Sequence, residues 1–152
     1  MKKFTTDNAK ETQAIAVDLA KRVRGGDVVA LYGELGTGKT TFTQAFAKTL
    51  GVKERVQSPT FILMHEHQVR PARKIPTSRR DYAPLRVFLH VDAYRGDAKQ
   101  FRAIGLEEYL GRPDTVVLIE WADRVEELLP KKRIQVFFKH LKGNRRRLSV
   151  KS

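Results

Sequence analysis

The chain has 152 residues, of which 41% are hydrophobic, a size and composition typical of one domain that buries its own core. It contains no cysteine, which excludes a disulfide framework, a thiolate metal site and a cysteine nucleophile. Thirty Lys and Arg residues against 17 Asp and Glu residues give a formal net charge of +13, which favours a polyanionic partner such as RNA or a strongly acidic protein.

The N-terminal segment is polar beyond its two lysines and leads into the first predicted helix. Its sequence, MKKFTTDNAKETQ, lacks the apolar run of a signal peptide, and no apolar run in the chain approaches the roughly 18 residues that span a bilayer. We therefore expect a cytoplasmic protein with no membrane partner. From Asp7 to Arg24, apolar and small residues recur at helical spacing. Thr6 or Asp7 is expected to cap this helix, and Gly25 and Gly26 are expected to end it.

A strand, a glycine-rich loop and a second helix are predicted next. Residues Asp27 to Tyr32 (DVVALY) form a short apolar run typical of a buried strand, and Thr40 to Leu50 has apolar residues at helical spacing before Gly51. Between them, GELGTGKTT at residues 33–41 matches the phosphate-loop pattern of a glycine, four free positions and then Gly-Lys-Thr. A strand before the loop and a helix after it are the context that this motif requires.

Each residue type in the loop suits phosphate binding. Gly36 and Gly38 allow backbone N–H groups to approach phosphate oxygens closely. The ammonium of Lys39 can reach the terminal phosphates, and the hydroxyl of Thr40 can bind Mg²⁺, which prefers oxygen ligands. The sequence thus predicts a site for a nucleotide and Mg²⁺ whose loop comprises Gly33, Glu34, Leu35, Gly36, Thr37, Gly38, Lys39, Thr40 and Thr41.

The rest of the chain is predicted to form strands, a long loop and one broken helix. The patterns predict an extended segment at 60–67, a proline-containing loop at 68–84, strands at 85–92 and 115–120, a helix at 98–110 broken near Gly105, and a hairpin of strands at 133–139 and 145–150. We expect a single α/β domain over residues 1–152, of the P-loop NTPase type. Its mixed, mainly parallel central sheet would be flanked by helices in two or three layers and carry an antiparallel C-terminal hairpin.

Two apolar runs end in a carboxylate. Asp92 follows VFLHV and Glu120 follows VVLI, so both acids are expected at the carboxyl edge of the sheet, where a phosphate loop needs a metal-binding acid. Glu120 is the first choice to bind Mg²⁺ together with Thr40, and Asp92 either joins the metal site or orients the attacking water. His90 shares a strand face with Asp92, but a lone histidine is more often a packed or hydrogen-bonded core residue.

The tetrapeptide SPTF at residues 58–61 follows the phosphate-loop helix. The hydroxyl of Thr60 can reach the γ-phosphate side of the site, as switch segments do in nucleotide hydrolases. A strand that begins at a proline explains the same residues equally well. The predicted catalytic set is therefore Lys39, Thr60, Asp92 and Glu120, and it contains no recognisable arginine finger, so hydrolysis by the isolated chain is expected to be slow.

Taken together, five segments resemble the TsaE family of small bacterial ATPases, which are required for threonylcarbamoyladenosine formation at position 37 of tRNA. The resemblance covers about residues 7 to 139 and rests on YGELGTGKTTFTQAFAKTLGV, SPTF, HVDAYR, IGLEEYL and VVLIEWADR. It implies a P-loop ATPase that binds a heterodimer of TsaD and TsaB and resets it through ATP binding and hydrolysis. It also implies magnesium ligands at Thr40 and Glu120, a switch at residues 58–61, a required Asp92, and the family's tryptophan at Trp121.

The basic segments depart from that resemblance and leave other functions open. A basic, proline-containing insertion at about residues 69–86 is longer than the family usually has, and residues 131–152 contain nine Lys and Arg residues and no acid. Either segment is a solvated surface or a contact with tRNA or a protein partner. One alternative function is a small-molecule or nucleoside kinase with the insertion as its lid. Another is a nucleotide-gated RNA-binding protein.

Overall fold

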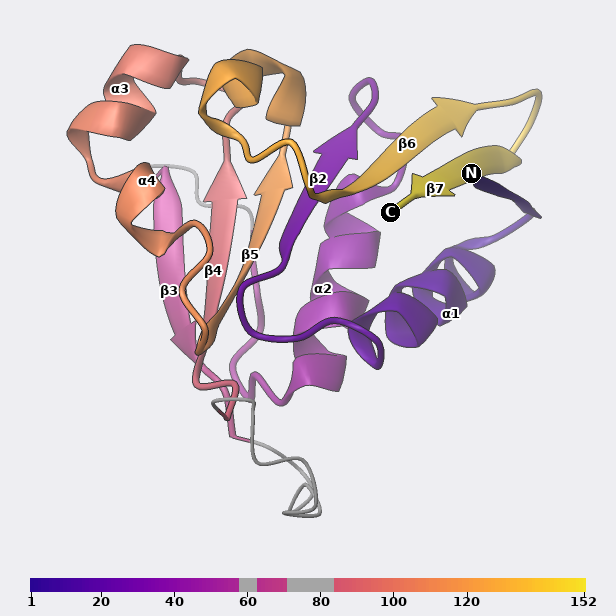
Figure 1. The fold of residues 1–152 in the computed structure, drawn as a ribbon. Helices are drawn as coiled ribbons and strands as arrows, with labels where there is room; N and C mark the ends of the chain where they lie inside the picture. Colours follow the sequence, from indigo (N-terminus) through magenta and orange to yellow (C-terminus); the bar gives the residue numbers. More distant parts are fainter. Residues whose placement is uncertain (58–62, 71–83) are drawn as a thin grey trace.

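A seven-stranded sheet forms the middle layer of the computed structural model, which describes residues 1–57, 63–70 and 84–152. The strands lie in the order β1-β7-β6-β2-β5-β4-β3 (Figure 1). Five of them run in one direction, whereas β3 and β7 run in the other. The strand bounds are β1 Lys2–Thr6, β2 Val28–Tyr32, β3 Met64–Gln68, β4 Val87–Asp92, β5 Thr115–Glu120, β6 Ile134–His140 and β7 Arg146–Lys151.

Helices cover both faces of the sheet, so the domain has three layers. The helices α1 (Ala9–Ala20) and α2 (Lys39–Leu50) pack on one face. The short helices α3 (Ala98–Ala103) and α4 (Leu106–Tyr109) and the 3₁₀ helix η1 (Ala122–Leu128) pack on the other (Figure 1). The expected α/β fold, with a mixed, mainly parallel sheet and an antiparallel C-terminal hairpin of β6 and β7, is confirmed.

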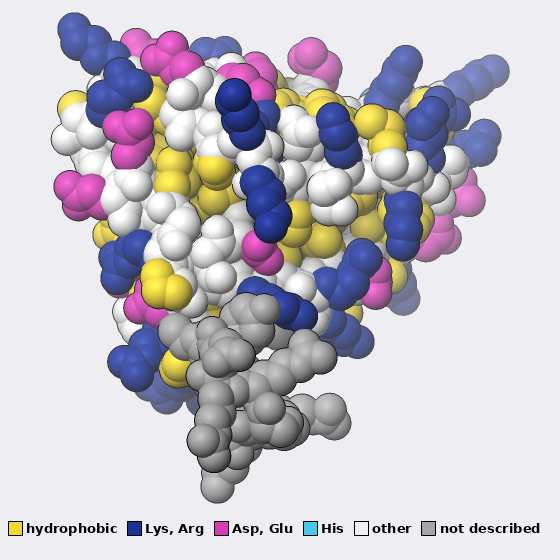
Figure 2. All heavy atoms as spheres, viewed as in Figure 1, with side chains coloured by type: hydrophobic (Ala, Val, Ile, Leu, Met, Phe, Trp, Pro, Cys, Tyr) yellow, Lys and Arg dark blue, Asp and Glu magenta, His cyan; other side chains and the backbone are white. Residues whose placement is uncertain are grey.

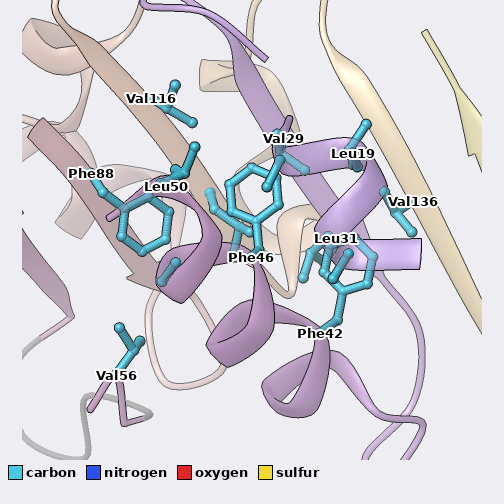
Figure 3. Packing of buried hydrophobic residues seen from close by; sticks show 14 of the residues in the cluster. Leu19, Val29, Leu31, Phe42, Phe46, Leu50, Val56, Phe88, Val116 and Val136 are labelled. Atoms are coloured by element: carbon cyan, nitrogen blue, oxygen red, sulfur yellow. The ribbon is translucent and has the colours of Figure 1, made fainter. Parts of the chain in front are cut away.

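The central strands are apolar on both sides because each side meets a helix layer. In β2, Val29 and Leu31 point toward α1 and α2, and Val28 and Ala30 point toward the opposite layer. Figure 3 shows Phe42, Phe46 and Leu50 of α2, spaced four residues apart, against sheet residues such as Val116 and Val136. This packing fixes α2 on the sheet and with it the loop that precedes α2.

The N-terminus differs from the prediction in two ways. Residues Lys2–Thr6, expected to be a polar lead, form strand β1, which pairs with β7 and places Thr6 in the core, where its hydroxyl lies 3.1 Å from that of Thr12. Because Thr6 belongs to the strand, it does not cap α1. The cap is Asn8, whose side chain accepts a hydrogen bond of 3.0 Å from the backbone N–H of Glu11.

The first helix ends at Ala20 with Lys21 as its C-cap, four residues before the predicted end at Arg24, so Gly25 and Gly26 do not end it. Other predicted boundaries agree closely with the structure. The helical stretch after Ala98 is broken at Gly105, which has φ of 87°, and the hairpin turn contains Gly143 with φ of 67°. The 3₁₀ helix η1 was not predicted. The SPTF segment with Thr60, and residues 71–83 of the basic insertion, lie outside the described residues. None of the helices in the described part of the chain has the length and apolar character needed to traverse a bilayer.

Candidate active site

The phosphate loop joins the end of β2 to the start of α2 with a backbone that only glycine adopts easily. Gly33 has φ of 141°, and a Cβ on it would lie 2.5 Å from the carbonyl oxygen of Phe138 in β6. Gly38 has φ of 102° and stands directly before α2. The hydroxyl of Thr37 donates a hydrogen bond of 2.7 Å to the carbonyl of Glu34 and closes the loop on itself. The motif is therefore folded as a compact turn at the helix N-terminus.

The start of α2 is open to an anion. Backbone N–H groups in the first turn of a helix have no acceptor within the helix, and the helix dipole favours negative charge there. Among the described residues, no side chain caps this end of α2. The loop and the first turn of α2 thus have the polarity and the geometry that bind phosphate groups.

Lys39 is folded into this loop. Its side chain is buried, and its ammonium donates to the carbonyl of Gly33 at 2.5 Å and to that of Glu34 at 2.7 Å. The same nitrogen lies 4.0 Å from the centre of the Trp121 ring, a cation–π contact. Burial lowers the pKa of Lys39, and the nearby carboxylates, above all that of Glu120, oppose this shift.

The two predicted acids come together because β4 and β5 are adjacent parallel strands. Asp92 and Glu120 occupy opposing register positions at the carboxyl ends of these strands, and Glu120 also lies opposite Leu31 of β2. The sheet order therefore brings Glu120 beside the strand that leads into the phosphate loop. This is the edge at which open α/β sheets bind ligands.

Glu120 is buried and surrounded by polar partners. Its Oε1 lies 2.9 Å from His90 Nε2 and 3.0 Å from the hydroxyl of Thr43, which also lies 2.9 Å from the carbonyl of Lys39. Its Oε2 lies 3.5 Å from the hydroxyl of Thr40. His90 is thus a buried, hydrogen-bonded residue, as the sequence analysis favoured, and it orients the carboxylate.

Asp92 is placed differently. It is half-buried at the end of β4, and its Oδ1 accepts a hydrogen bond of 3.0 Å from the backbone N–H of Tyr94. Both acids line a pocket of about 310 Å³ together with Lys39 and Thr40. The carboxylate of Glu120 lies 3.5 Å from the hydroxyl of Thr40, so these two residues can bind one cation together, with Asp92 in the same pocket.

The donor atoms of this pocket suit Mg²⁺. Hydroxyl and carboxylate oxygens are the hard ligands that this ion takes, with waters completing its octahedron. Two neighbouring ligands in such an octahedron lie about 2.9 Å apart. The 3.5 Å between Thr40 and Glu120 needs only a small adjustment to reach that value. The residues present therefore fit the ion that the sequence predicted.

Arg146 is a pocket residue that the sequence analysis missed. It lies in β7, and its side chain is 3.6 Å from the position that a Cβ on Gly38 would take. Its Nη1 donates to the carbonyl of Asn144, whereas its buried Nε has no hydrogen-bond partner among the described residues. The alternation of side chains along a strand could have identified it, because Arg146 lies on the same face of β7 as the core residue Leu148.

Trp121 has an unusual backbone. Its φ of 58° makes it the one non-glycine residue with positive φ in the described part of the chain. Its ring packs against Tyr94, with 4.8 Å between ring centres, and over the ammonium of Lys39. Such backbone strain is concentrated at functional sites. Trp121 lines the same pocket as the residues of the phosphate loop.

Most of the predicted site residues converge in this one pocket. Lys39, Thr40, Asp92 and Glu120 line it together with residues of the loop. Thr60 lies outside the described residues, so its predicted role stays a prediction.

Comparisons with known proteins agree with this architecture. Residues 6–148 match the family model described as "Threonylcarbamoyl adenosine biosynthesis protein TsaE". The tRNA threonylcarbamoyladenosine biosynthesis protein TsaE of Bacillus subtilis is 37% identical over 97% of this chain and 83% of its own length. Its namesake in Streptomyces coelicolor is 42% identical over 72% of this chain and 67% of its own. The crystal structure of YdiB from Bacillus subtilis superposes with a TM-score of 0.70 at 34% identity, covering 97% of this chain and 82% of that one.

Proposed function

Since this chain belongs to the TsaE family of threonylcarbamoyl adenosine biosynthesis proteins, we propose that it is a Mg²⁺-dependent ATPase that supports this modification of tRNA. The observation that carries the proposal is the meeting of a phosphate loop with a buried acid from another strand. The hydroxyl of Thr40, at the start of α2, lies 3.5 Å from the carboxylate of Glu120 at the end of β5. A triphosphate and its metal need that pair of groups side by side.

The triphosphate is bound by the loop and by Lys39. When phosphate oxygens arrive, they offer the ammonium of Lys39 stronger acceptors than the carbonyls of Gly33 and Glu34 that it contacts in their absence. Backbone N–H groups of the loop and of the first turn of α2 bind the remaining oxygens. Because the ammonium is already buried in the pocket, phosphate binding requires a short movement and little new desolvation.

Thr40 and Glu120 are the groups that would hold Mg²⁺. An ion held there would neutralise charge that develops on the phosphates during hydrolysis. His90 and Thr43 keep the Glu120 carboxylate in place through contacts at its Oε1, which leaves Oε2 directed toward Thr40. Asp92 lies opposite Glu120 in the register of β4 and β5, which supports a role in accepting a hydrogen bond from the attacking water.

Arg146 supplies a second cation to the same pocket. Its unpartnered buried Nε and its proximity to Gly38 place the guanidinium beside the phosphate loop, where a planar donor pairs well with phosphate oxygens. The chain therefore contains an arginine in cis, although no local motif marks it.

The proposed role in the cell is to reset a complex of TsaD and TsaB between rounds of tRNA modification. This part rests on family membership and on the sequence resemblance. ATP as the nucleotide has the same support. The charge of +13 is compatible with a partner complex that holds tRNA.

A reconstituted modification assay tests the proposal. Purified protein is combined with TsaD, TsaB, tRNA, ATP and Mg²⁺, together with the substrates that form the modified base. Multiple rounds of modification and phosphate release are expected only with the intact chain. Lys39→Ala and Glu120→Gln should each abolish both, whereas Lys10→Ala, at an exposed position in α1, should keep both. Full turnover with either of the first two variants would overturn the assignment.

A further inference from the structure

A second group of metal-binding side chains lies away from the phosphate loop. Glu54, in the segment after α2, comes together with His65 and His67 of the edge strand β3. One donor atom from each residue lies within 4.8 Å of the others. The two histidines are two positions apart in the strand, so both project from the same sheet face, the one that α2 covers.

The contacts within this group are close. The carboxylate of Glu54 contacts Nδ1 of His67, and the rings of His65 and His67 have centres 4.1 Å apart. His67 is buried with 1% of its side chain exposed, whereas Glu54 and His65 are exposed. A cation can therefore reach the group from solvent through Glu54 and His65, while the surrounding core holds the His67 ring in place. Among the described residues, Nε2 of His67 has no hydrogen-bond partner.

We propose that Glu54, His65 and His67 bind a divalent transition-metal ion of the zinc type. Two imidazoles and one carboxylate are a donor set that Zn²⁺ takes in proteins, with water in the fourth position. Bonds of about 2.0–2.2 Å place tetrahedral ligands about 3.4 Å apart. The exposed side chains of Glu54 and His65 can adjust to that spacing, while buried His67 serves as the fixed ligand.

An ion pair between Glu54 and His67 alone does not account for the group. That pair needs one histidine, and it leaves unexplained the second imidazole, whose ring centre lies 4.1 Å from that of His67. A metal ion uses both imidazoles and the carboxylate as ligands, so it accounts for all three side chains.

The zinc-type site is distinct from the predicted Mg²⁺ site. Glu54 follows the C-terminal end of α2, whereas Thr40 lies in its first turn, and a helix of 12 residues is about 18 Å long. The chemistry also differs, because imidazole nitrogens select zinc-type ions and the hydroxyl and carboxylate oxygens of the nucleotide pocket select Mg²⁺. The two sites have no ligand in common.

Metal titration of the full chain tests this proposal without nucleotide. Zn²⁺ is titrated in excess Mg²⁺ against a chromogenic chelator, and Co²⁺ is used to record visible absorption from a tetrahedral site. We expect one Zn²⁺ per chain. His65→Ala and Glu54→Gln should each weaken binding at least about tenfold, because even the loss of an outer partner of a metal ligand costs that much. Both residues are exposed, so neither variant removes core packing.

His140→Ala is the matched control, since His140 is exposed in β6 and outside the group. It should bind Zn²⁺ like the parent chain. Equal affinity in the parent, His65→Ala and Glu54→Gln would place the ion elsewhere, for example between His90 and Glu120, and would overturn the proposal. So would the absence of stoichiometric binding. Neither outcome bears on the ATPase assay, which uses different residues.

Discussion

Arg146 and Lys39 lie far apart in the sequence but bring two cations into one pocket. Lys39 is already engaged by the carbonyls of Gly33 and Glu34, whereas Nε of Arg146 is buried without a hydrogen-bond partner among the described residues. A buried donor without a partner is costly, and an anion in the pocket would relieve that cost. At the residue scale, this unpartnered donor supports the proposal that Arg146 binds the nucleotide.

We expect Arg146→Ala to weaken binding of an ATP analogue by about tenfold or more, since a hydrogen bond to a charged group contributes about 1.5–3 kcal/mol. Arg147→Ala is the control, because the neighbouring side chain is exposed on the other face of β7. Calorimetric titration of both variants measures the difference. Equal affinities for the two variants would remove Arg146 from the site.

The single tryptophan should report nucleotide binding. The ammonium of Lys39 lies 4.0 Å from the centre of the Trp121 ring, and phosphate oxygens would draw that ammonium away from the indole. A change in tryptophan fluorescence is therefore expected on adding an ATP analogue with Mg²⁺. In Lys39→Ala, the unliganded protein should already lack the cation, so its starting spectrum should differ from that of the parent. An unchanged spectrum in both experiments would contradict the contact.

At the scale of elements, the phosphate loop begins where the backbone after β2 packs closely against β6. Gly33 follows β2, and the carbonyl of Phe138 in β6 lies where a Cβ on Gly33 would collide. Gly36, at the tip of the same loop, also has positive φ, at 75°, but nothing lies within 4 Å of its ideal Cβ. An alanine would have an unfavourable φ at either position, but only at Gly33 would its Cβ also collide with another strand.

Gly33→Ala should destabilise the fold more than Gly36→Ala does. Both alanines adopt an unfavourable backbone, which costs about 1–2 kcal/mol, and only the first also displaces β6. Urea denaturation of both variants measures the free energy of unfolding. If Gly36→Ala were as destabilising as Gly33→Ala, the close approach to Phe138 would not be the cause.

At the scale of the whole molecule, positive charge is spread over the surface and gathers on the C-terminal hairpin. Figure 2 shows Lys and Arg side chains standing out over the end of the β6–β7 hairpin. The exposed residues there include Lys139, Lys142, Arg145 and Arg147, and Arg145 forms an ion pair of 3.2 Å with Asp7. Arg146, between the last two arginines, faces the nucleotide pocket and does not belong to this surface.

This surface predicts salt-dependent association with RNA. Affinity for tRNA should fall as salt rises, because Lys and Arg release counterions from phosphates. Replacing Arg145 and Arg147 together by Ala should reduce the slope of log affinity against log salt by about 1.4–1.8, if both contact phosphates. Filter binding across a salt series measures the slope. An unchanged slope would show that the hairpin does not contact RNA.

Much of the candidate site could be predicted from local patterns in the sequence. The loop at residues 33–41 lies between an apolar run and a helical repeat, and these neighbours predicted the strand-loop-helix unit that the structure shows. Asp92 and Glu120 were also predicted from neighbouring residues alone. Each follows an apolar run directly, which identifies it as the acid at the end of a strand without reference to the rest of the fold. The sequence by itself thus determined the strand-loop-helix unit of the phosphate-loop motif, the two strand-end acids and the α/β class.

Tertiary structure decided which of these residues meet. Strand order places β5 between β2 and β4, which brings Glu120 to Thr40 and Asp92 beside it. Pairing of β1 with β7 and the turn of the hairpin bring Arg146 to Gly38, and the antiparallel pairing of β3 with β4 puts two histidines near Glu54. Periodicity in a sequence reports which face of an element is buried. Pairing between distant strands depends on the packing energy of the whole sheet, which no local pattern records.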